Sequence, residues 1–157
     1  MFDLYEELRK VTAAFDERNI DYALCGGLAM AVYDHARATI DIDVLILSDS
    51  LDSALQIARE LDYTIRGLDL SFADGAIEIR RVSKIHPTTR HVLTLDMLLV
   101  TAAIRDVWDS RVEADVEDGK LSVVSREGLI ALKKFRGSGR DMDDIALLKE
   151  DIDDATS

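Results

Sequence analysis

Apolar and polar positions alternate along this chain with two periods, and each period predicts a different kind of element. From residue 2 to residue 15 the large apolar side chains return every three or four positions with charged residues between them. This spacing predicts an amphipathic first helix that ends near Arg18 and Asn19. The same reading predicts later helices over residues 28–34, 51–61, 126–136 and 141–150. Alternating or continuous short apolar runs predict strands over residues 22–25, 41–47, 63–70, 76–85, 111–117 and 120–124.

Turn and cap residues separate these elements. Asp74-Gly75 and Asp118-Gly119 lie between pairs of predicted strands, as expected for hairpin turns. Ser48-Asp49-Ser50 is a helix start signal, and Ser125 is placed to cap the helix that follows it. Gly137-Ser138-Gly139 ends that helix. Residues 92–104 are ambiguous and are read as the end of a strand followed by a helix.

Helices and strands are therefore interspersed, which predicts an α/β or α+β domain built around one mixed sheet flanked by helices, with helices at the C-terminus. Residues 1–150 are expected to form a single domain, because 157 residues bury one core. The acidic segment 151–157 is expected to be a frayed, disordered tail.

Composition excludes several protein classes. Apolar residues make up 48% of the chain and charged residues 32%, as in ordinary globular proteins, and no apolar run approaches the ~20 residues of a membrane span. The start of the chain is acidic and has no secretory h-region, and Cys25 is the single cysteine, so a cytoplasmic location is expected. A net charge of −12 argues against an extensive nucleic-acid-binding surface.

Two aspartates in one predicted strand carry the clearest chemical signal. Asp41 and Asp43 share one face of that strand, whereas the apolar residues between and beside them take the other face. Two carboxylates ~6 Å apart repel by roughly 3 kcal/mol at an effective dielectric of ~20. A divalent cation turns this repulsion into binding, so the pair predicts a metal site.

A glycine pair precedes the aspartates. Gly26-Gly27 follows a predicted strand and opens a predicted helix, which leaves bare backbone N–H groups and the positive end of a helix dipole facing any ligand. Both features favour phosphate. Phosphates at the turn and a metal at the aspartates would together position a nucleoside triphosphate.

This pattern resembles the nucleotidyltransferase superfamily with a polymerase-β-like fold, and more closely its bacterial AbiEii-toxin-type members. The resemblance rests on three motifs in order: Gly26-Gly27-Leu28-Ala29, then Arg37-x-Thr39-x-Asp41-Ile42-Asp43, then Lys133 followed by Arg140-Asp141-Met142-Asp143-Asp144-Ile145. It covers most of the chain, and it implies a nucleotidyltransferase-like mixed sheet.

The resemblance also implies roles for the metal-binding residues. Asp41 and Asp43 would hold Mg²⁺ or Mn²⁺ together with a third carboxylate on a later strand. Glu78 is the expected third ligand, because it lies on the polar face of its predicted strand, and Asp69 is the alternative.

Further roles follow for the residues near the phosphates. Lys133 would bind phosphate and Asp144 would support the site. The nucleotide would also contact residues of the first two motifs and the start of the third, namely Gly26, Gly27, Leu28, Arg37, Thr39 and Arg140. Arg37 and Thr39 have an alternative role, which is to pair with nearby aspartates.

Two functional hypotheses follow. In the first, the protein is a metal-dependent nucleotidyltransferase that moves a nucleoside monophosphate from an NTP to a hydroxyl of an RNA end, a protein or a small molecule. By resemblance it would work in a toxin–antitoxin setting with an antitoxin-like protein partner. In the second, it is an inactive nucleotide-binding or protein-interaction module, because Leu28 supplies no hydroxyl where many superfamily members have serine.

Overall fold

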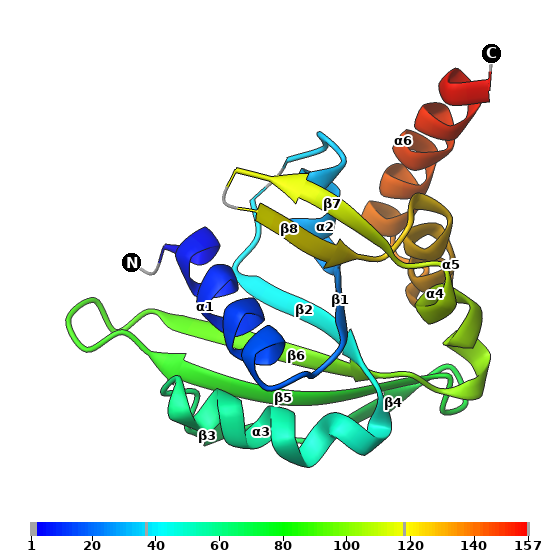
Figure 1. Ribbon diagram of the computed structural model, residues 1–157. Coiled ribbons are helices and arrows are strands. Elements are labelled where there is room, and N and C mark those ends of the chain that lie inside the picture. The colour runs from blue at the N-terminus through cyan, green and yellow to red at the C-terminus, as the bar shows by residue number, and fades with distance from the viewer. Residues whose placement is uncertain (1–2, 37, 118, 157) are drawn as a thin grey trace.

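The computed structural model describes residues 3–36, 38–117 and 119–156, and in them eight strands form one mixed sheet (Figure 1). The strand order is β3-β5-β6-β2-β1-β8-β7, and β4 pairs with β5 outside this path. β2 runs parallel to β6 and β1 runs parallel to β8, whereas the other pairs are antiparallel. The strands are β1 Tyr22–Cys25, β2 Asp41–Ile46, β3 Ile65–Arg66, β4 Leu70–Phe72, β5 Ile77–Ile85, β6 Val92–Leu99, β7 Val112–Val116 and β8 Gly119–Val123.

Side-chain caps mark the starts of two helices, and the cap at Ser125 is the predicted one. Asp3 accepts a hydrogen bond from the Glu6 backbone N–H at the start of α1, and Ser125 accepts one from Gly128 at the start of α5. The α-helices are α1 Leu4–Glu17, α2 Gly26–Val32, α3 Leu51–Glu60, α4 Arg105–Asp109, α5 Arg126–Arg136 and α6 Gly139–Thr156. Short 3₁₀ turns, η1 Ser48–Ser50 and η2 Ala102–Ile104, precede α3 and α4.

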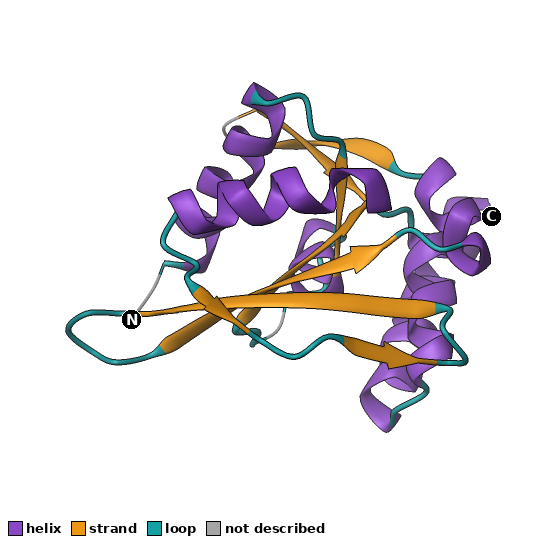
Figure 2. Ribbon diagram, turned by 90° about the horizontal axis from the view of Figure 1, so that it is seen from below, coloured by secondary structure: helices purple, strands orange, loops and turns teal. Residues whose placement is uncertain are grey.

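The two faces of the sheet have different coverings. α1 and α3 pack on one face, where the apolar side chains of β2 and β6, such as Ile42, Val44 and Leu95, are fully buried. α5 and α6 pack against each other and gather at one end of the sheet (Figures 1 and 2). The other face of β2, β5 and β6 carries polar side chains that are only partly covered. This face is called the open face below.

Three predicted elements differ from the observed ones. The single strand expected over residues 63–70 is two short strands that pair with different parts of β5, β3 near its end and β4 near its start, and Tyr63 before them is completely buried. The ambiguous segment 92–104 is the long strand β6 followed by η2. The segment expected to fray continues α6 as far as Thr156, and Asp151 there pairs with His35 and Arg126.

The predicted α/β architecture with a mixed sheet flanked by helices is confirmed. No helix in the described part of the chain is long and apolar enough to cross a membrane.

Candidate active site

A row of side chains crosses four neighbouring strands on the open face of the sheet. Asp43 on β2 lies opposite Cys25 of β1 on one side and opposite Asp96 of β6 on the other. Asp96 in turn lies opposite Arg81 of β5. Because residues paired across adjacent strands share a face and lie about 5 Å apart, this register brings Asp43 and Asp96 together, with Asp41 two positions along β2.

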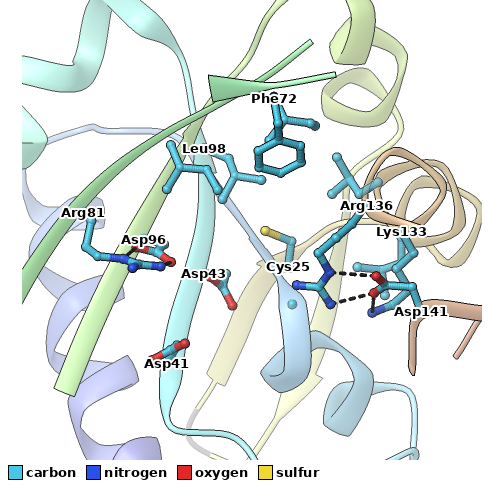
Figure 3. A pocket seen from close by; sticks show the side chains of 15 residues that line it. Cys25, Asp41, Asp43, Phe72, Arg81, Asp96, Leu98, Lys133, Arg136 and Asp141 are labelled. Carbon is cyan, nitrogen blue, oxygen red and sulfur yellow. Dashed lines mark hydrogen bonds and ion pairs between the residues drawn. The ribbon is translucent and has the colours of Figure 1, made fainter. Parts of the chain in front are cut away.

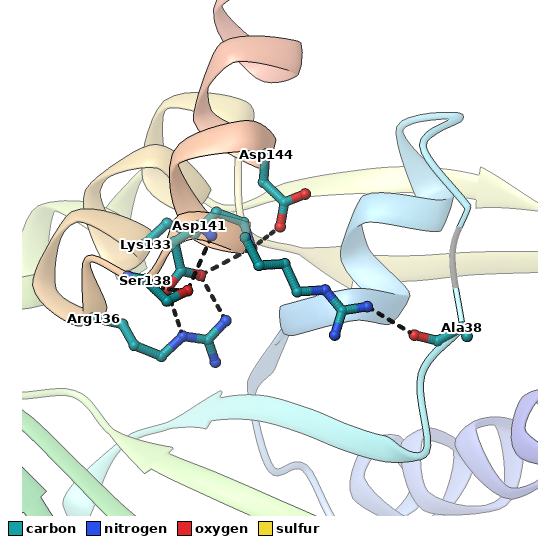
Figure 4. Close-up of polar contacts among 7 residues, drawn as sticks. Ala38, Lys133, Arg136, Ser138, Asp141 and Asp144 are labelled. Carbon is teal, nitrogen blue, oxygen red and sulfur yellow. Dashed lines mark hydrogen bonds and ion pairs between the residues drawn. The ribbon is translucent and has the colours of Figure 1, made fainter.

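Helices α5 and α6 place a second charged group beside this row (Figure 4). The Lys133 Nζ lies 2.9 Å from Asp144 Oδ2 and 4.0 Å from Asp141 Oδ1. Arg136 donates two hydrogen bonds to the Asp141 carboxylate, at 2.7 and 2.6 Å, and the Ser138 backbone and hydroxyl donate two more. Lys133 is 6% exposed and Asp141 is completely buried, so these contacts hold Lys133 and Arg136 in place.

The two groups line one cavity of about 310 Å³ (Figure 3). One wall is the acidic row of the sheet, and the facing wall is the basic end of α5. The polar lining residues are Asp41, Asp43, Asp96, Arg81, Lys133, Arg136 and Asp141, and the apolar ones include Phe72, Ile77, Ile79, Leu98, Leu129 and Leu132. An anion whose charge is partly neutralised by a cation at the aspartates would complement both walls.

Burial and repulsion from neighbouring carboxylates raise the pKa values of Asp43 and Asp41. The pKa of Asp43 is raised to about 7, first because its carboxyl is buried and then because Asp96 and Asp41 lie nearby. The pKa of Asp41 is also raised, by burial and by the charge of Asp96. Burial and the proximity of Asp43 raise the pKa of the Cys25 thiol well above its usual value, so this cysteine is not a nucleophile.

The arginines of the cavity are held in their charged form. A hydrogen bond to Asp96 raises the pKa of Arg81, and a hydrogen bond to Asp141 raises the pKa of Arg136. Burial by itself would raise the pKa of Asp141, but the hydrogen bonds from Arg136 and Ser138 outweigh it and the pKa is lowered. Asp141 is therefore an ionised partner of Arg136, whereas Asp43 and Asp41 bear charge that is poorly compensated.

The chemistry of the sheet row fits a divalent metal. Carboxylate oxygens are the ligands that Mg²⁺ and Mn²⁺ prefer, and a cation would relieve the repulsion that raises the pKa of Asp43. Across the described residues, no group of three or more His, Cys, Asp and Glu side chains is arranged to hold a metal ion. The carboxylates that line this wall of the cavity, and would have to draw together around an ion, are Asp41, Asp43 and Asp96.

The glycine pair lies directly beside these carboxylates. Gly26 adopts φ +69°, and a Cβ there would lie 2.2 Å from Asp43 Oδ2, so only glycine fits next to the carboxylate. A Cβ on Gly27 would lie 2.9 Å from the Thr39 side chain, which packs against this turn. Leu28 is 2% exposed and belongs to the core. Arg37, which the sequence also assigns to the phosphates, lies outside the described residues.

The structure does not bring the predicted third carboxylate to the site. On β5 the cavity is lined by Ile77, Ile79 and Arg81, and strand alternation places Glu78 on the opposite face. Asp69, the alternative, is exposed and pairs with Arg66 and Arg80 away from the cavity. The apolar face of this strand, not its polar face, points toward the aspartates.

Two further predicted residues lie at the edge of the site. Asp144 does not line the cavity but pairs with Lys133 behind it, as expected of a supporting residue. The Arg140 guanidinium donates a 3.1 Å hydrogen bond to the Ala38 carbonyl and ties α6 to the segment before β2 (Figure 4).

Asp96, Arg81 and Arg136 are polar cavity residues that the sequence pattern did not assign to the site. Asp96 occupies the place expected for Glu78, on the strand next to Asp43. The signal was present, because Thr94 and Asp96 are the polar positions of one face in the apolar run 92–99. Because the run is otherwise apolar, its two polar positions are a weak signal and the segment stays ambiguous between strand and helix.

Comparisons with known proteins bear on the fold. No family model and no curated protein matches this chain. Among solved structures, the antibiotic-resistance factor ANT(2'')-Ia superposes with a TM-score of 0.61 at 17% identity, over 92% of this chain and 82% of that one. It has also been solved in complex with adenylyl-2''-tobramycin, with a TM-score of 0.61.

Two other solved structures share the fold of this chain. The lincomycin-bound lincosamide antibiotic adenylyltransferase LnuA matches with a TM-score of 0.55 at 16% identity, over 92% of this chain and 95% of that one. A nucleotidyltransferase candidate from Thermotoga maritima matches with a TM-score of 0.59 at 13% identity, over 96% and 92%. The chain therefore has the fold of nucleotidyltransferase structures.

Proposed function

We propose that this protein is a nucleotidyltransferase that depends on Mg²⁺ or Mn²⁺ and moves a nucleoside monophosphate from an NTP to a hydroxyl acceptor. One observation carries the proposal: Asp41, Asp43 and Asp96 converge on one face of the sheet and face Lys133 and Arg136 across a single cavity. Nucleotidyl transfer requires positioning and charge neutralisation, and these two walls supply both. The fold shared with nucleotidyltransferase structures supports the same reading.

Three aspartates would share the work on the acidic wall. Asp41, Asp43 and Asp96 would hold the metal, with Asp96 as the third carboxylate, the role predicted for Glu78. When bound, the divalent ion supplies charge neutralisation for the carboxylates and for the triphosphate. Asp96, paired across from Asp43, is placed to accept the proton of the attacking hydroxyl as its oxygen bonds to the α-phosphorus and the bond to pyrophosphate breaks.

The basic wall and the glycine turn would bind the phosphates. Lys133 and Arg136 are held by Asp144 and Asp141, so they present charge without having to be ordered by the ligand. Gly26 and Gly27 would allow a close backbone approach, because a Cβ on Gly26 would meet Asp43 and one on Gly27 would meet Thr39.

A small hydroxylated molecule is the acceptor class with most support. Of the structures that share the fold, ANT(2'')-Ia was solved with an adenylylated antibiotic and LnuA with lincomycin. A net charge of −12 weighs against a long RNA acceptor, although an RNA end or a protein hydroxyl is tested alongside. The toxin–antitoxin setting and its protein partner stay predictions of the sequence resemblance.

The test is transfer of label from each α-³²P NTP in Mg²⁺ or Mn²⁺ to panels of hydroxylated small molecules, RNA ends and proteins. Transfer that is lost in Asp43→Asn and retained in Asp69→Asn, a matched carboxylate outside the cavity, supports the proposal. Equal transfer by Asp43→Asn contradicts it. Tight, metal-dependent NTP binding without transfer to any acceptor would instead support the inactive nucleotide-binding module.

A further inference from the structure

Arg81 occupies both oxygens of the carboxylate that the proposed reaction needs. Its Nε donates to Asp96 Oδ1 at 2.8 Å and its Nη2 donates to Asp96 Oδ2 at 2.9 Å, so the guanidinium and the carboxylate lie fork to fork (Figure 3). The two residues are direct cross-strand partners in the β5–β6 register. This pairing is built into the sheet and does not depend on a surface loop.

Such a pair competes with a metal for Asp96. The guanidinium places a positive charge where a cation bound by Asp43 and Asp96 would need both carboxylates. A bidentate hydrogen-bonded pair also uses the oxygen lone pairs that point toward Arg81. Metal coordination by Asp96 and the complete Arg81 pair are therefore mutually unfavourable.

The Arg81–Asp96 pair reaches solvent on its arginine side, and its carboxylate is less enclosed than that of the second arginine pair, Arg136–Asp141. The Asp96 side chain is 6% exposed, whereas the Arg81 side chain is 40% exposed and reaches solvent. Gly67 lies beside the stem of this arginine, and a Cβ there would lie 3.1 Å from Arg81 Cγ. By contrast, the partner of Arg136, Asp141, is completely buried and also bonded by Ser138.

We propose that Arg81 is a cationic latch on Asp96: it neutralises the buried carboxylate while the site is empty, and Asp96 exchanges it for the divalent ion when the site is loaded. This proposal rests on the proposed function, because it takes Asp96 as part of the metal site. Arg81 is a positioning residue in this account. It sets metal affinity and holds the empty site together.

The first test measures Mn²⁺ binding to the nucleotide-free protein by electron paramagnetic resonance of free Mn²⁺. Arg81→Met keeps the apolar stem and removes the competing charge, so the apparent Kd for Mn²⁺ should fall at least about fivefold. Arg80→Met is the matched control, because it makes the same charge change on the neighbouring residue, which pairs with Asp69 on the other face of β5. Its Kd should stay near the wild-type value.

The same variants separate a latch from a merely structural arginine. In EDTA, Arg81→Met should lower the Tm, because Asp96 loses its charged partner, and Mn²⁺ should restore the Tm by more than it raises that of the wild type. If Arg81→Met does not fold, Arg81→Lys, which cannot form the bidentate pair, should show the same tightening to a smaller extent.

A direct readout follows the arginine itself. In ¹H–¹⁵N spectra the Arg81 Nε–H peak, identified by its absence in Arg81→Met, should shift as Mg²⁺ is added to the wild-type protein. Equal or weaker Mn²⁺ binding by Arg81→Met, or an Nε–H peak unchanged at saturating Mg²⁺, overturns the latch and leaves the proposed function standing. If no variant binds Mn²⁺ in a way that Asp43→Asn abolishes, both proposals fail.

Discussion

The same sheet carries a buried polar cluster on each face, and the two are balanced differently. Under α1 and α3, Glu7 accepts a 3.0 Å hydrogen bond from the Tyr63 hydroxyl and forms an ion pair with Lys84. Lys84 also donates to the Leu61 carbonyl at 3.2 Å and lies 4.6 Å from the centre of the Tyr63 ring. In this helix-face cluster the one acid, Glu7, is paired with Lys84 and also with Lys10, whose Nζ lies 3.4 Å from Glu7 Oε2.

The cluster on the open face is unbalanced. Among the described residues of the row, Arg81 is the one base beside three aspartates, Asp41, Asp43 and Asp96. Lys133 and Arg136 of α5 are already paired with acids of α6. The pKa values of Glu7 and Asp43 differ accordingly. Burial by itself would raise the pKa of Glu7, yet its bond to Lys84 lowers it, whereas the pKa of Asp43 stays raised to about 7.

The comparison shows how to separate a structural cluster from a functional one in the same fold. A buried charge that has its partner within the protein contributes to one unique packing and needs no ligand. An excess of like charge on a partly open face costs stability in the empty protein, and a ligand of opposite charge recovers it.

The largest expected effect comes from removing one carboxylate of the open-face cluster. Asp43→Asn should reduce nucleotidyl transfer at least about a thousandfold, about 4 kcal/mol, because an amide is a poor metal ligand. In EDTA at pH 8 the same variant should be more stable, with a free energy of unfolding at least about 1 kcal/mol higher than that of the wild type, because one repelling charge is gone. Denaturant unfolding and the labelled-NTP assay measure both, and a less stable variant would contradict the reading of excess charge.

The next largest effect comes from removing the carboxylate of the helix-face cluster. Glu7→Ala should lower the free energy of unfolding by about 2–3 kcal/mol, because the Lys84 ammonium and the Tyr63 hydroxyl lose their shared acceptor in a buried place. Urea denaturation measures the change. Transfer activity of the folded fraction should stay within about twofold of wild type, and a large loss of activity would show that the two clusters are coupled through the sheet.

A third effect concerns the turn next to Asp43. Gly26→Ala should cost about 2 kcal/mol or more, because it combines a left-handed φ with a clash against the Asp43 carboxylate. Gly75→Ala is the control, since its φ is +84° and no atom lies within 4 Å of its added Cβ, so it should cost only about 1 kcal/mol. Equal costs from chemical denaturation would show that the carboxylate moves aside freely.

The smallest expected effect is on how stability depends on pH, which should have opposite signs for the two clusters. The pKa of Asp43 is raised in the folded state, so its folded form holds a proton that the unfolded chain releases, and the protein loses stability as pH rises from about 4 to about 7. Relative to wild type, Asp43→Asn should therefore gain about 1 kcal/mol between pH 5 and pH 6 in EDTA.

The helix-face cluster should respond in the opposite direction. The pKa of Glu7 is lowered, so its contribution is present above about pH 4.5 and is lost as the pH falls below that value. The stability advantage of wild type over Glu7→Gln should accordingly shrink in acid. Unfolding curves from pH 3 to pH 8 check both signs.

Local pattern predicted most of the fold. The helical period before residue 15, the Ser125 cap and the Asp118-Gly119 turn each depend on neighbours in sequence, and the corresponding elements are present as α1, α5 and the β7–β8 pair. The segment 63–70 was harder, because the burial of Tyr63 depends on α1 and β5, which are distant in sequence.

Some residues of the site were likewise predictable from local motifs, whereas others depend on strand pairing. Asp41, Asp43, Gly26 and Lys133 were predicted from local motifs, and all four line the cavity. Glu78 was chosen because it lies on the polar face of its strand, but which face meets the aspartates depends on how β5 pairs with β6. That pairing puts Arg81 and Asp96 in the row and leaves Glu78 on the helix side.

The sequence by itself determined the kinds of elements, the carboxylate pair on one strand and the lysine that emerges from an apolar helix face, because periodicity and spacing along the chain specify which side chains share a face. Only the tertiary structure decided which faces meet. The parallel register of β2 with β6 chose Asp96 as the neighbour of Asp43, and the antiparallel register of β5 with β6 set Arg81 against it. Register depends on hydrogen bonds and packing between distant segments, which no local pattern contains.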